Sequence, residues 1–220
     1  VSAQRTRRQW SEGGKARSTV MARMDPLPLD QCPDQDLAHE LGHFTKTLGF
    51  VPNSLLTMQR VPAIARAVIQ LNRAVFAPDG EVDLGLKRLV AHMASTASGC
   101  QYCKAHTSVS ATRHGVTDEK MAAVYDYSTS PLFSEAERVA LDFAMEAASV
   151  PNAVTDESYA RLAEHWSESQ IVEILGVVCM FGVFNRWNDS MATPLEEVPL
   201  ARAEELIGPR GWEPGKHVDS

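Results

Sequence analysis

The feature that most constrains the fold is an apolar segment late in the chain, residues 168–191, whose side chains are apolar on nearly every side from Ile171 to Phe184. Ser167, followed three residues later by Gln170, gives this segment the capping-box start of a helix. A helix that is apolar nearly all round must be covered by other elements. We therefore expect a central, buried helix against which the remaining elements pack.

Apolar residues recur at helical spacing along the rest of the chain, whereas alternating β-branched runs bounded by turn residues are nearly absent. Thr117 and Ser134 are further residues of the kind that cap helix starts. The fold class predicted is all-α, a multi-helix bundle. The other expected helices cover about residues 33–49, 54–60, 62–76, 83–98 and 100–114.

Charge is distributed unevenly over the 220 residues. Residues 1–24 hold six basic residues and one acid, so they carry +5, while the whole chain has a net charge of −7 and the remainder carries −12. We expect residues 1–24 to be a disordered basic arm, residues 25–195 one helical domain, and residues 196–220 a loosely packed tail. Met21 and Met24 are both plausible natural starts, so whether the arm is native stays open.

Composition excludes several classes of partner. The acidic balance argues against nucleic acid, because phosphate binding needs lysines and arginines clustered on one face. No stretch approaches the roughly 18 uninterrupted apolar residues of a membrane span, and the basic arm has no secretory apolar run. Four cysteines in a chain of this size do not form the disulfide framework of a small secreted domain. We expect a cytoplasmic protein with a small-molecule or protein partner.

The most informative stretch holds Cys100 and Cys103, followed by His106. Two cysteines separated by two residues at a helix start can form a disulfide with little movement. The unpaired N–H groups and the dipole of that helix also lower a thiol pKa and favour the reactive thiolate. His106 lies on the same helical face as Cys103, where it could act as a base or stabilise a thiolate.

Two other interpretations of this pair are a zinc site and a pair of buried structural cysteines. A zinc site needs further ligands, but Cys32 and Cys179 have no second Cys-x-x-Cys around them, and Cys179 lies in the apolar segment. The pattern therefore favours redox chemistry, and we expect no metal.

Three stretches together resemble a known family: Leu86 to His92, the turn Gly99-Cys100-Gln101-Tyr102-Cys103, and Ala105-His106-Thr107. They look like the core of the AhpD-like (alkylhydroperoxidase) fold of the carboxymuconolactone decarboxylase superfamily. The similarity extends to residues 48–53, 134–138 and 184–186 and covers most of residues 35–190. It implies an AhpD-like helical bundle that forms homo-oligomers, and we expect no cofactor.

The resemblance also implies roles for the site residues. One cysteine reduces a peroxide and the other resolves the product as a disulfide, with a nearby histidine and an upstream glutamate relaying protons. The resemblance assigns the attack to Cys103, whereas the helix-terminus argument alone favours Cys100.

Two positions depart from the peroxidase pattern of that family. The expected histidine position is Thr107, one residue after His106, and the expected relay glutamate is Arg88. His92 lies one turn beyond Arg88 on the same side of the helix and could take over proton transfer; the alternative is a half-buried helix histidine. The predicted catalytic set is Cys100, Cys103, His106 and His92.

These features predict a thiol-dependent peroxidase or thiol-disulfide oxidoreductase that reduces small peroxides and is recycled by a thiol reductant protein or a small dithiol. The alternative is a carboxymuconolactone decarboxylase-like enzyme that acts on a small organic acid without redox turnover. A remote alternative is a zinc hydrolase, because residues 39–43 match His-Glu-x-x-His. The longer zinc-protease motif, which extends His-Glu-x-x-His by a glycine and a third histidine, is not matched, because Lys46 and Gly49 occupy those two positions.

Overall fold

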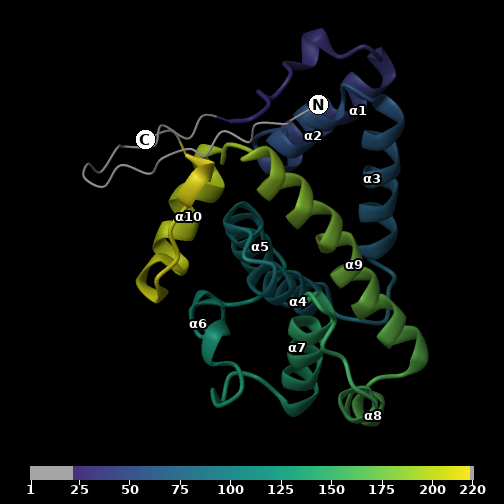
Figure 1. Cartoon of the computed structure of the whole chain (residues 1–220), viewed down its shortest axis with the longest axis vertical. Coiled ribbons are helices and arrows are strands. Elements are labelled where there is room, and N and C mark those ends of the chain that lie inside the picture. Colours follow the sequence, from purple (N-terminus) through teal and green to yellow (C-terminus); the bar gives the residue numbers. More distant parts are fainter. Residues whose placement is uncertain (1–21, 219–220) are drawn as a thin grey trace, which may run out of the picture.

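The computed structural model describes residues 22–218, and the secondary structure in this range is helical with no β-strand. The predicted all-α fold class is confirmed. The arm expected over residues 1–24 lies almost wholly outside the described residues. The α-helices are α1 (Gln35–Leu48), α2 (Asn53–Met58), α3 (Pro62–Val75), α4 (Leu84–Ala97), α5 (Gln101–Arg113), α6 (Asp118–Ala122), α7 (Glu135–Ala148), α8 (Asp156–His165), α9 (Glu168–Met191) and α10 (Glu197–Leu206) (Figure 1).

Side-chain caps fix most helix starts where the sequence predicts them. Ser134 and Ser167 form capping boxes with the glutamate or glutamine three residues on, at the starts of α7 and α9. Helix α8 has the same kind of start at Thr155 but was not expected from the sequence. Its third residue after the cap is Ser158, a weaker signal than a glutamate or glutamine.

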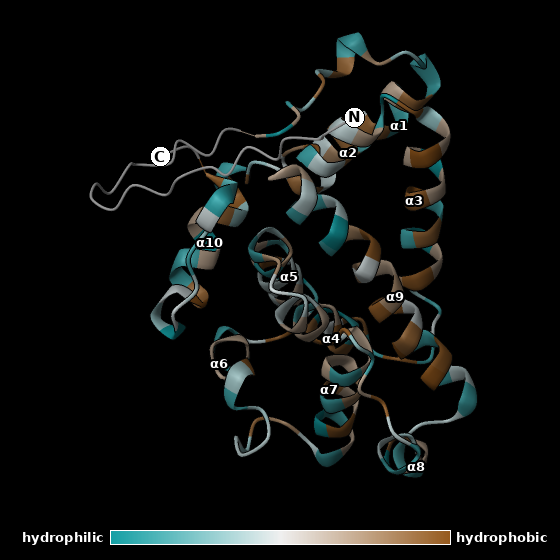
Figure 2. Cartoon of the chain, viewed as in Figure 1, coloured by the Kyte–Doolittle hydropathy of each residue, from teal (hydrophilic) through white to brown (hydrophobic). Residues whose placement is uncertain are grey.

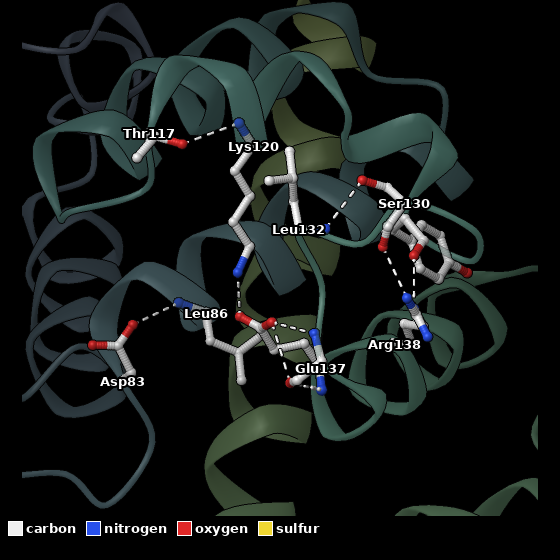
Figure 3. A network of polar contacts seen from close by, with 10 residues as sticks. Asp83, Leu86, Thr117, Lys120, Ser130, Leu132, Glu137 and Arg138 are labelled. Atoms are coloured by element: carbon white, nitrogen blue, oxygen red, sulfur yellow. Dashed lines mark hydrogen bonds and ion pairs between the residues drawn. The ribbon is translucent and has the colours of Figure 1, made fainter.

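Polar contacts hold the connection between α6 and α7 (Figure 3). Thr117 caps α6, and Lys120 of that helix pairs with Glu137 of α7 at 2.6 Å. The same Glu137 carboxylate accepts from the backbone N–H of Ser134, while Arg138 donates to the backbone oxygen of Ser130 at 2.8 Å. These bonds tie the intervening loop to the first turn of α7.

The main core forms where α4 packs against α5, α7 and α9. Fully buried residues of α4, such as Leu89 and Val90, lie in one apolar cluster with Ile174 and Val177 of α9. Helix α9 also packs against α3 and α2, beside a second, smaller cluster that includes Leu41 and Ile69 (Figures 1 and 2). The long apolar helix therefore joins both clusters, and it holds the α4–α5 pair in place.

One face of α9 differs from the expectation of a helix buried on all sides. Val172, Leu175, Cys179 and Val183 lie on this face and are exposed, Val172 by 70%. They recur three or four residues apart, so they share one side, and α4, α5 and α7 cover the other. Within residues 22–218, α9 is the one helix long and apolar enough to cross a membrane, but a core helix has the same length and composition.

The end of the chain also differs from expectation. Residues 196–220 were expected to pack loosely, but α10 packs against α5 and carries buried Ala203 and Leu206. Trp212 is 4% exposed, and its ring N–H donates to the backbone oxygen of Gln101 at 3.3 Å. The described part of this segment is therefore an integral cover of α5, because its spaced apolar residues have a surface to bury.

An ion pair between a buried lysine and a half-buried glutamate fastens α4 to α9. Lys87 has a side chain only 1% exposed, and its ammonium lies 2.7 Å from the Glu173 carboxylate and 3.0 Å from the Val75 backbone oxygen. Glu173 also accepts from the backbone N–H groups of Glu81 and Val82. Removing one member of such a pair leaves a buried charge without its partner.

We predict that Glu173→Ala lowers the free energy of unfolding by about 3 kcal/mol, since it strands the Lys87 ammonium and two backbone donors. Urea denaturation measures this difference. Glu164→Ala, at an exposed position of α8, should change stability by about 0.5 kcal/mol or less. Equal effects of the two variants would contradict the structural role of the pair.

Candidate functional site

The two cysteines lie at the start of α5, as the sequence predicts. Gly99 has a φ of 72°, in the left-handed region, and turns the chain from α4 into α5. Cys100 is the N-cap residue, and its sulfur accepts from the backbone N–H of Cys103 at 3.4 Å. Both residues are buried and both are free thiols. The helix start therefore presents its donors to the sulfur of Cys100.

The two thiols have opposite electrostatic tendencies. A hydrogen bond from the Cys103 thiol, aided by the Cys103 backbone N–H, lowers the pKa of Cys100 against the cost of burial. Burial, together with that same bond, raises the pKa of Cys103 well above its ordinary value. When the pair holds one proton, the negative charge thus resides on Cys100 and the proton on Cys103.

Access to the two sulfurs differs as well. A cavity of about 220 Å³ opens beside α5, and Cys103 lines it whereas Cys100 does not. The walls are largely apolar, formed by residues of α1, α2, α3, α5 and α9 and the loop before α2: Phe44, Leu48, Phe50, Leu55, Val68, Ile69, Val109, Phe181 and Phe184. A molecule in this cavity meets Cys103 first.

His106 also lines the cavity, and its partner is a carboxylate from the far end of the chain. The His106 Nε2 atom lies 2.7 Å from a Glu196 oxygen, and the ring stacks on Tyr102 with centroids 4.3 Å apart. The Tyr102 hydroxyl and the Asn53 backbone N–H donate to the other Glu196 oxygen, at 2.8 and 2.6 Å. Among the described residues, no hydrogen bond joins His106 to either sulfur.

Glu196 is ionised in this setting. Burial alone would raise the pKa of Glu196, but the charge and hydrogen bond of His106 and the Asn53 N–H outweigh burial and lower it. A carboxylate with these donors holds the imidazole in one orientation at the cavity wall.

His92 lies behind the cavity wall, on α4. Burial lowers the pKa of His92 to about 3, so the imidazole is neutral near pH 7. The Thr107 hydroxyl donates to the Cys103 backbone oxygen at 2.8 Å, so the His92 Nδ1–H donates to that hydroxyl at 2.9 Å. The His92 Nε2 atom then accepts from the Tyr125 hydroxyl at 3.0 Å. His92 reaches the cavity through Thr107, which lines it.

Two asparagines of α9 complete the surroundings of Cys103. The Asn188 amide N–H lies 3.5 Å from the Cys103 sulfur, where it can donate to a thiolate. Asn185 makes a long bond, 3.5 Å, to the backbone oxygen of Ala94. The side-chain oxygens of both asparagines are buried with no partner among the described residues.

Arg88 stands where the AhpD-like pattern places its relay glutamate, and it lines the same cavity as Cys103. Its guanidinium lies over the Phe76 ring, 3.4 Å from the centroid. Burial lowers the pKa of Arg88 to about 10, which still leaves it charged at neutral pH.

The His-Glu-x-x-His segment lies on α1, away from the cysteines. His39 and His43 are exposed, with ring centroids 5.0 Å apart, and Glu40 pairs with Arg73 at 2.8 Å. Among residues 22–218, no group of three or more His, Cys, Asp or Glu side chains is placed to hold a metal ion. The zinc hydrolase alternative has no supporting geometry in this range.

Of the predicted residues, Cys100 and Cys103 are hydrogen-bonded, Cys103 and His106 line the same cavity, and His92 is linked to Cys103 through Thr107. Sequence reasoning missed Glu196, which it placed in the tail, and Asn188, whose polar side chain within an apolar helix was an unused signal. No local pattern marks Glu196, because its partners lie at least ninety residues away.

The chain resembles several known proteins. The carboxymuconolactone decarboxylase family pattern matches residues 62–146, which include both cysteines. The uncharacterised protein YnjA of Escherichia coli K12 is 32% identical over 97 residues, which cover 44% of this chain and 53% of YnjA. The chain thus spans about half the length of that relative.

Solved structures match over a larger share of the chain. The apo debrominase Bmp8 is 35% identical with a TM-score of 0.75, over 83% of this chain and 96% of Bmp8. A cysteine-to-alanine variant of Bmp8 in complex with 2,3,4-tribromopyrrole is 34% identical with a TM-score of 0.76, over 83% of this chain and 96% of that one. A peroxidase-related AhpD-core protein from Ralstonia eutropha JMP134 has the same fold at 20% identity, with a TM-score of 0.73 over 90% of this chain and 98% of that one. With this helical fold and a Gly-Cys-x-x-Cys turn at the start of α5, the chain belongs to the AhpD-like carboxymuconolactone decarboxylase superfamily.

Proposed function

We propose that this protein is a two-cysteine thiol reductase that reduces a small organic peroxide in the cavity beside α5. One observation carries the proposal: Cys103 opens to the cavity, while Cys100 stands behind it, hydrogen-bonded to it and favoured as the thiolate. Such an arrangement separates a sulfur that meets the substrate from a sulfur that closes the disulfide.

In the first step Cys103 gives up its proton, its thiolate attacks the terminal peroxide oxygen, and the O–O bond breaks. The proton that the two sulfurs share leaves with the alkoxide as the alcohol, and Cys103 becomes a sulfenic acid. The Asn188 amide N–H stabilises negative charge on the Cys103 sulfur as the proton departs.

In the second step the Cys100 thiolate attacks the Cys103 sulfur, the S–O bond breaks, and hydroxide leaves and takes a proton to become water. One peroxide is reduced and two thiols are oxidised to one disulfide. A dithiol reductant, protein or small molecule, then exchanges with this disulfide and restores both thiols.

His106 and Glu196 support the first step in this proposal. The His106 ring lines the cavity and passes the proton released by the sulfur pair to the leaving alkoxide, and its contact with Glu196 keeps the imidazole oriented toward the cavity. His92 acts through Thr107, whose hydroxyl it holds against the Cys103 backbone.

Reductive dehalogenation is a second candidate, favoured by the similarity to the debrominase Bmp8 and by the aromatic walls of the cavity. Here the Cys103 sulfur takes a halogen from carbon, and the carbon is protonated. Cys100 then displaces halide from Cys103 and forms the same disulfide. Both reactions use the two cysteines in the same order, so they differ only in the electrophile.

Self-association is a further part of the proposal. The exposed apolar face of α9, with Leu175 and Val183, is of the kind that a second copy of a helical protein covers. A cytoplasmic location with reduced thiols fits the need for two free cysteines.

We predict that one equivalent of organic hydroperoxide consumes two thiols and forms the Cys100–Cys103 disulfide, without disulfide-linked dimers. Cys100→Ser and Cys103→Ser should each abolish turnover with a dithiol reductant, since attack and resolution each need one sulfur. In Cys100→Ser a sulfenic acid should accumulate on Cys103, detected by dimedone labelling and mass spectrometry.

Cys179→Ser is the matched control, because Cys179 is an exposed thiol of α9, away from the cavity lining. This variant should turn over like the unmodified chain. If four thiols persist in the unfolded protein after peroxide treatment, the proposal fails and a decarboxylase-like enzyme acting on a small organic acid becomes the better candidate.

We also predict a pH-dependent stability effect at Glu196. The pKa of this group is lowered by folding, so its contribution is present above the unfolded pKa, about 4.3, and is lost as pH falls through the folded value. Glu196→Gln should therefore cost about 1–3 kcal/mol at pH 7 and less at pH 4. Glu197→Gln, an exposed neighbour, should show neither effect in urea denaturation. A stability difference between the unmodified chain and Glu196→Gln that grows as the pH falls would contradict a lowered pKa of Glu196.

A further inference from the structure

We propose that the molecule bound in this cavity is a small amphipathic anion, with an apolar ring or chain and one carboxylate- or phenolate-type oxygen held by Arg88. The inference rests on the proposed function only in taking the cavity at Cys103 as the reacting site. It names the substrate class, which the cysteine chemistry alone leaves open.

The first observation is the charge of the cavity lining. Two arginines and two histidines line it, Arg88, Arg113, His106 and His114, and no aspartate or glutamate of residues 22–218 does. The chain as a whole is acidic, with 28 Asp and Glu against 21 Lys and Arg. A cavity lined by arginines and by no carboxylate draws anions and repels cations.

The second observation is that Arg88 lacks a counter-charge. Within the described part of the chain, its guanidinium makes no ion pair, and its Nε–H is buried without a hydrogen-bond partner. Its neighbour is the Phe76 ring, which attracts the cation but accepts no conventional hydrogen bond. A partly buried charge with no partner is costly, so a ligand that offers an acceptor to Arg88 gains a hydrogen bond that the folded chain does not form.

The other basic side chains nearby are hydrogen-bonded, paired or exposed, whereas Arg88 is partly buried and has no partner among the described residues. Lys87, the preceding residue on α4, is paired with Glu173. His106 is paired with Glu196, and Arg113 donates to the Leu48 backbone oxygen at 3.4 Å. The His114 ring contacts the Ser110 backbone oxygen at 2.7 Å.

The walls determine the rest of the ligand. Rings of Phe44, Phe50, Phe181 and Phe184 line the cavity, and they accommodate an apolar body rather than a hydrated ion. The volume of about 220 Å³ lies below the roughly 300–1,000 Å³ of drug-sized pockets, so the ligand is small. A guanidinium at one place and a thiol at another would orient an anionic substrate with its acid group on Arg88 and its reactive group toward Cys103.

Benzoate and benzamide test this class, because they share a ring and differ in charge. In isothermal titration of the reduced full chain, benzoate should bind at least about tenfold more tightly than benzamide, the size of a charge-assisted hydrogen bond. Arg88→Gln should abolish the preference, and Arg88→Lys should retain part of it. Arg161→Gln, which removes the same charge from an exposed site on α8, should keep the full preference.

A second readout uses the thiol itself and requires no turnover. Iodoacetate and iodoacetamide alkylate cysteine and differ in charge, so their rate ratio at Cys103, measured by peptide mass spectrometry, reports an anion preference near that sulfur. Relative to free cysteine, the ratio should favour iodoacetate in the unmodified chain and in Arg161→Gln, and should return to the free-cysteine value in Arg88→Gln.

The outcomes separate this inference from the redox proposal. Three outcomes would each overturn the assignment to Arg88. The first is equal affinity for benzoate and benzamide, and the second is an anion preference that survives in Arg88→Gln. The third is no measurable binding of either probe, together with an alkylation ratio like that of free cysteine. An anion preference in a protein whose thiols resist hydroperoxide would sustain the anion site and refute the reductase.

Discussion

One carboxylate, that of Glu196, holds together parts of the site that are far apart in the sequence. It receives hydrogen bonds from the Asn53 backbone, the Tyr102 hydroxyl and the His106 ring. These residues lie on α2 and α5, while Glu196 precedes α10, so the contacts fasten α10 over the cysteine helix. The cavity wall at His106 therefore depends on a segment about ninety residues further along the chain.

The two cysteines show why a low pKa and access to substrate need not coincide. Cys100 has the donors of the helix start and is the better thiolate, yet it does not line the cavity. Cys103 lines the cavity, but burial raises its pKa. The hydrogen bond between them makes the pair one acid–base unit, in which the helix start favours the thiolate on Cys100 while the AhpD-like resemblance assigns the attack to Cys103.

The sequence predicted what is local and missed what is distant. Helical spacing and caps such as Ser134 and Ser167 located most helices, and the Gly-Cys-x-x-Cys turn located the sulfur pair, because these signals lie within a few residues of one another. The exposed face of α9 and the packing of the last segment depend on which helices become neighbours. The apolar residues from Ile171 to Phe184 predict that the helix packs in the core, but they do not predict which of its faces stays exposed.

Two consecutive basic residues on α4, the buried Lys87 and the partly buried Arg88, have different surroundings and therefore different roles. Lys87 points toward α9, where Glu173 and a backbone oxygen neutralise and satisfy it, so it fastens two helices. Arg88, one residue on, turns about 100° around the helix and reaches the cavity, where an aromatic ring is its neighbour and no carboxylate lines the wall. A glutamate at this position, as in the peroxidase pattern, would relay protons and repel an anion. An arginine does neither, so the same fold and the same cysteine pair present a different surface to the substrate. In the proposed mechanism this single exchange places the recognition of charge in the cavity, while proton transfer depends on residues from α5 and the start of α10.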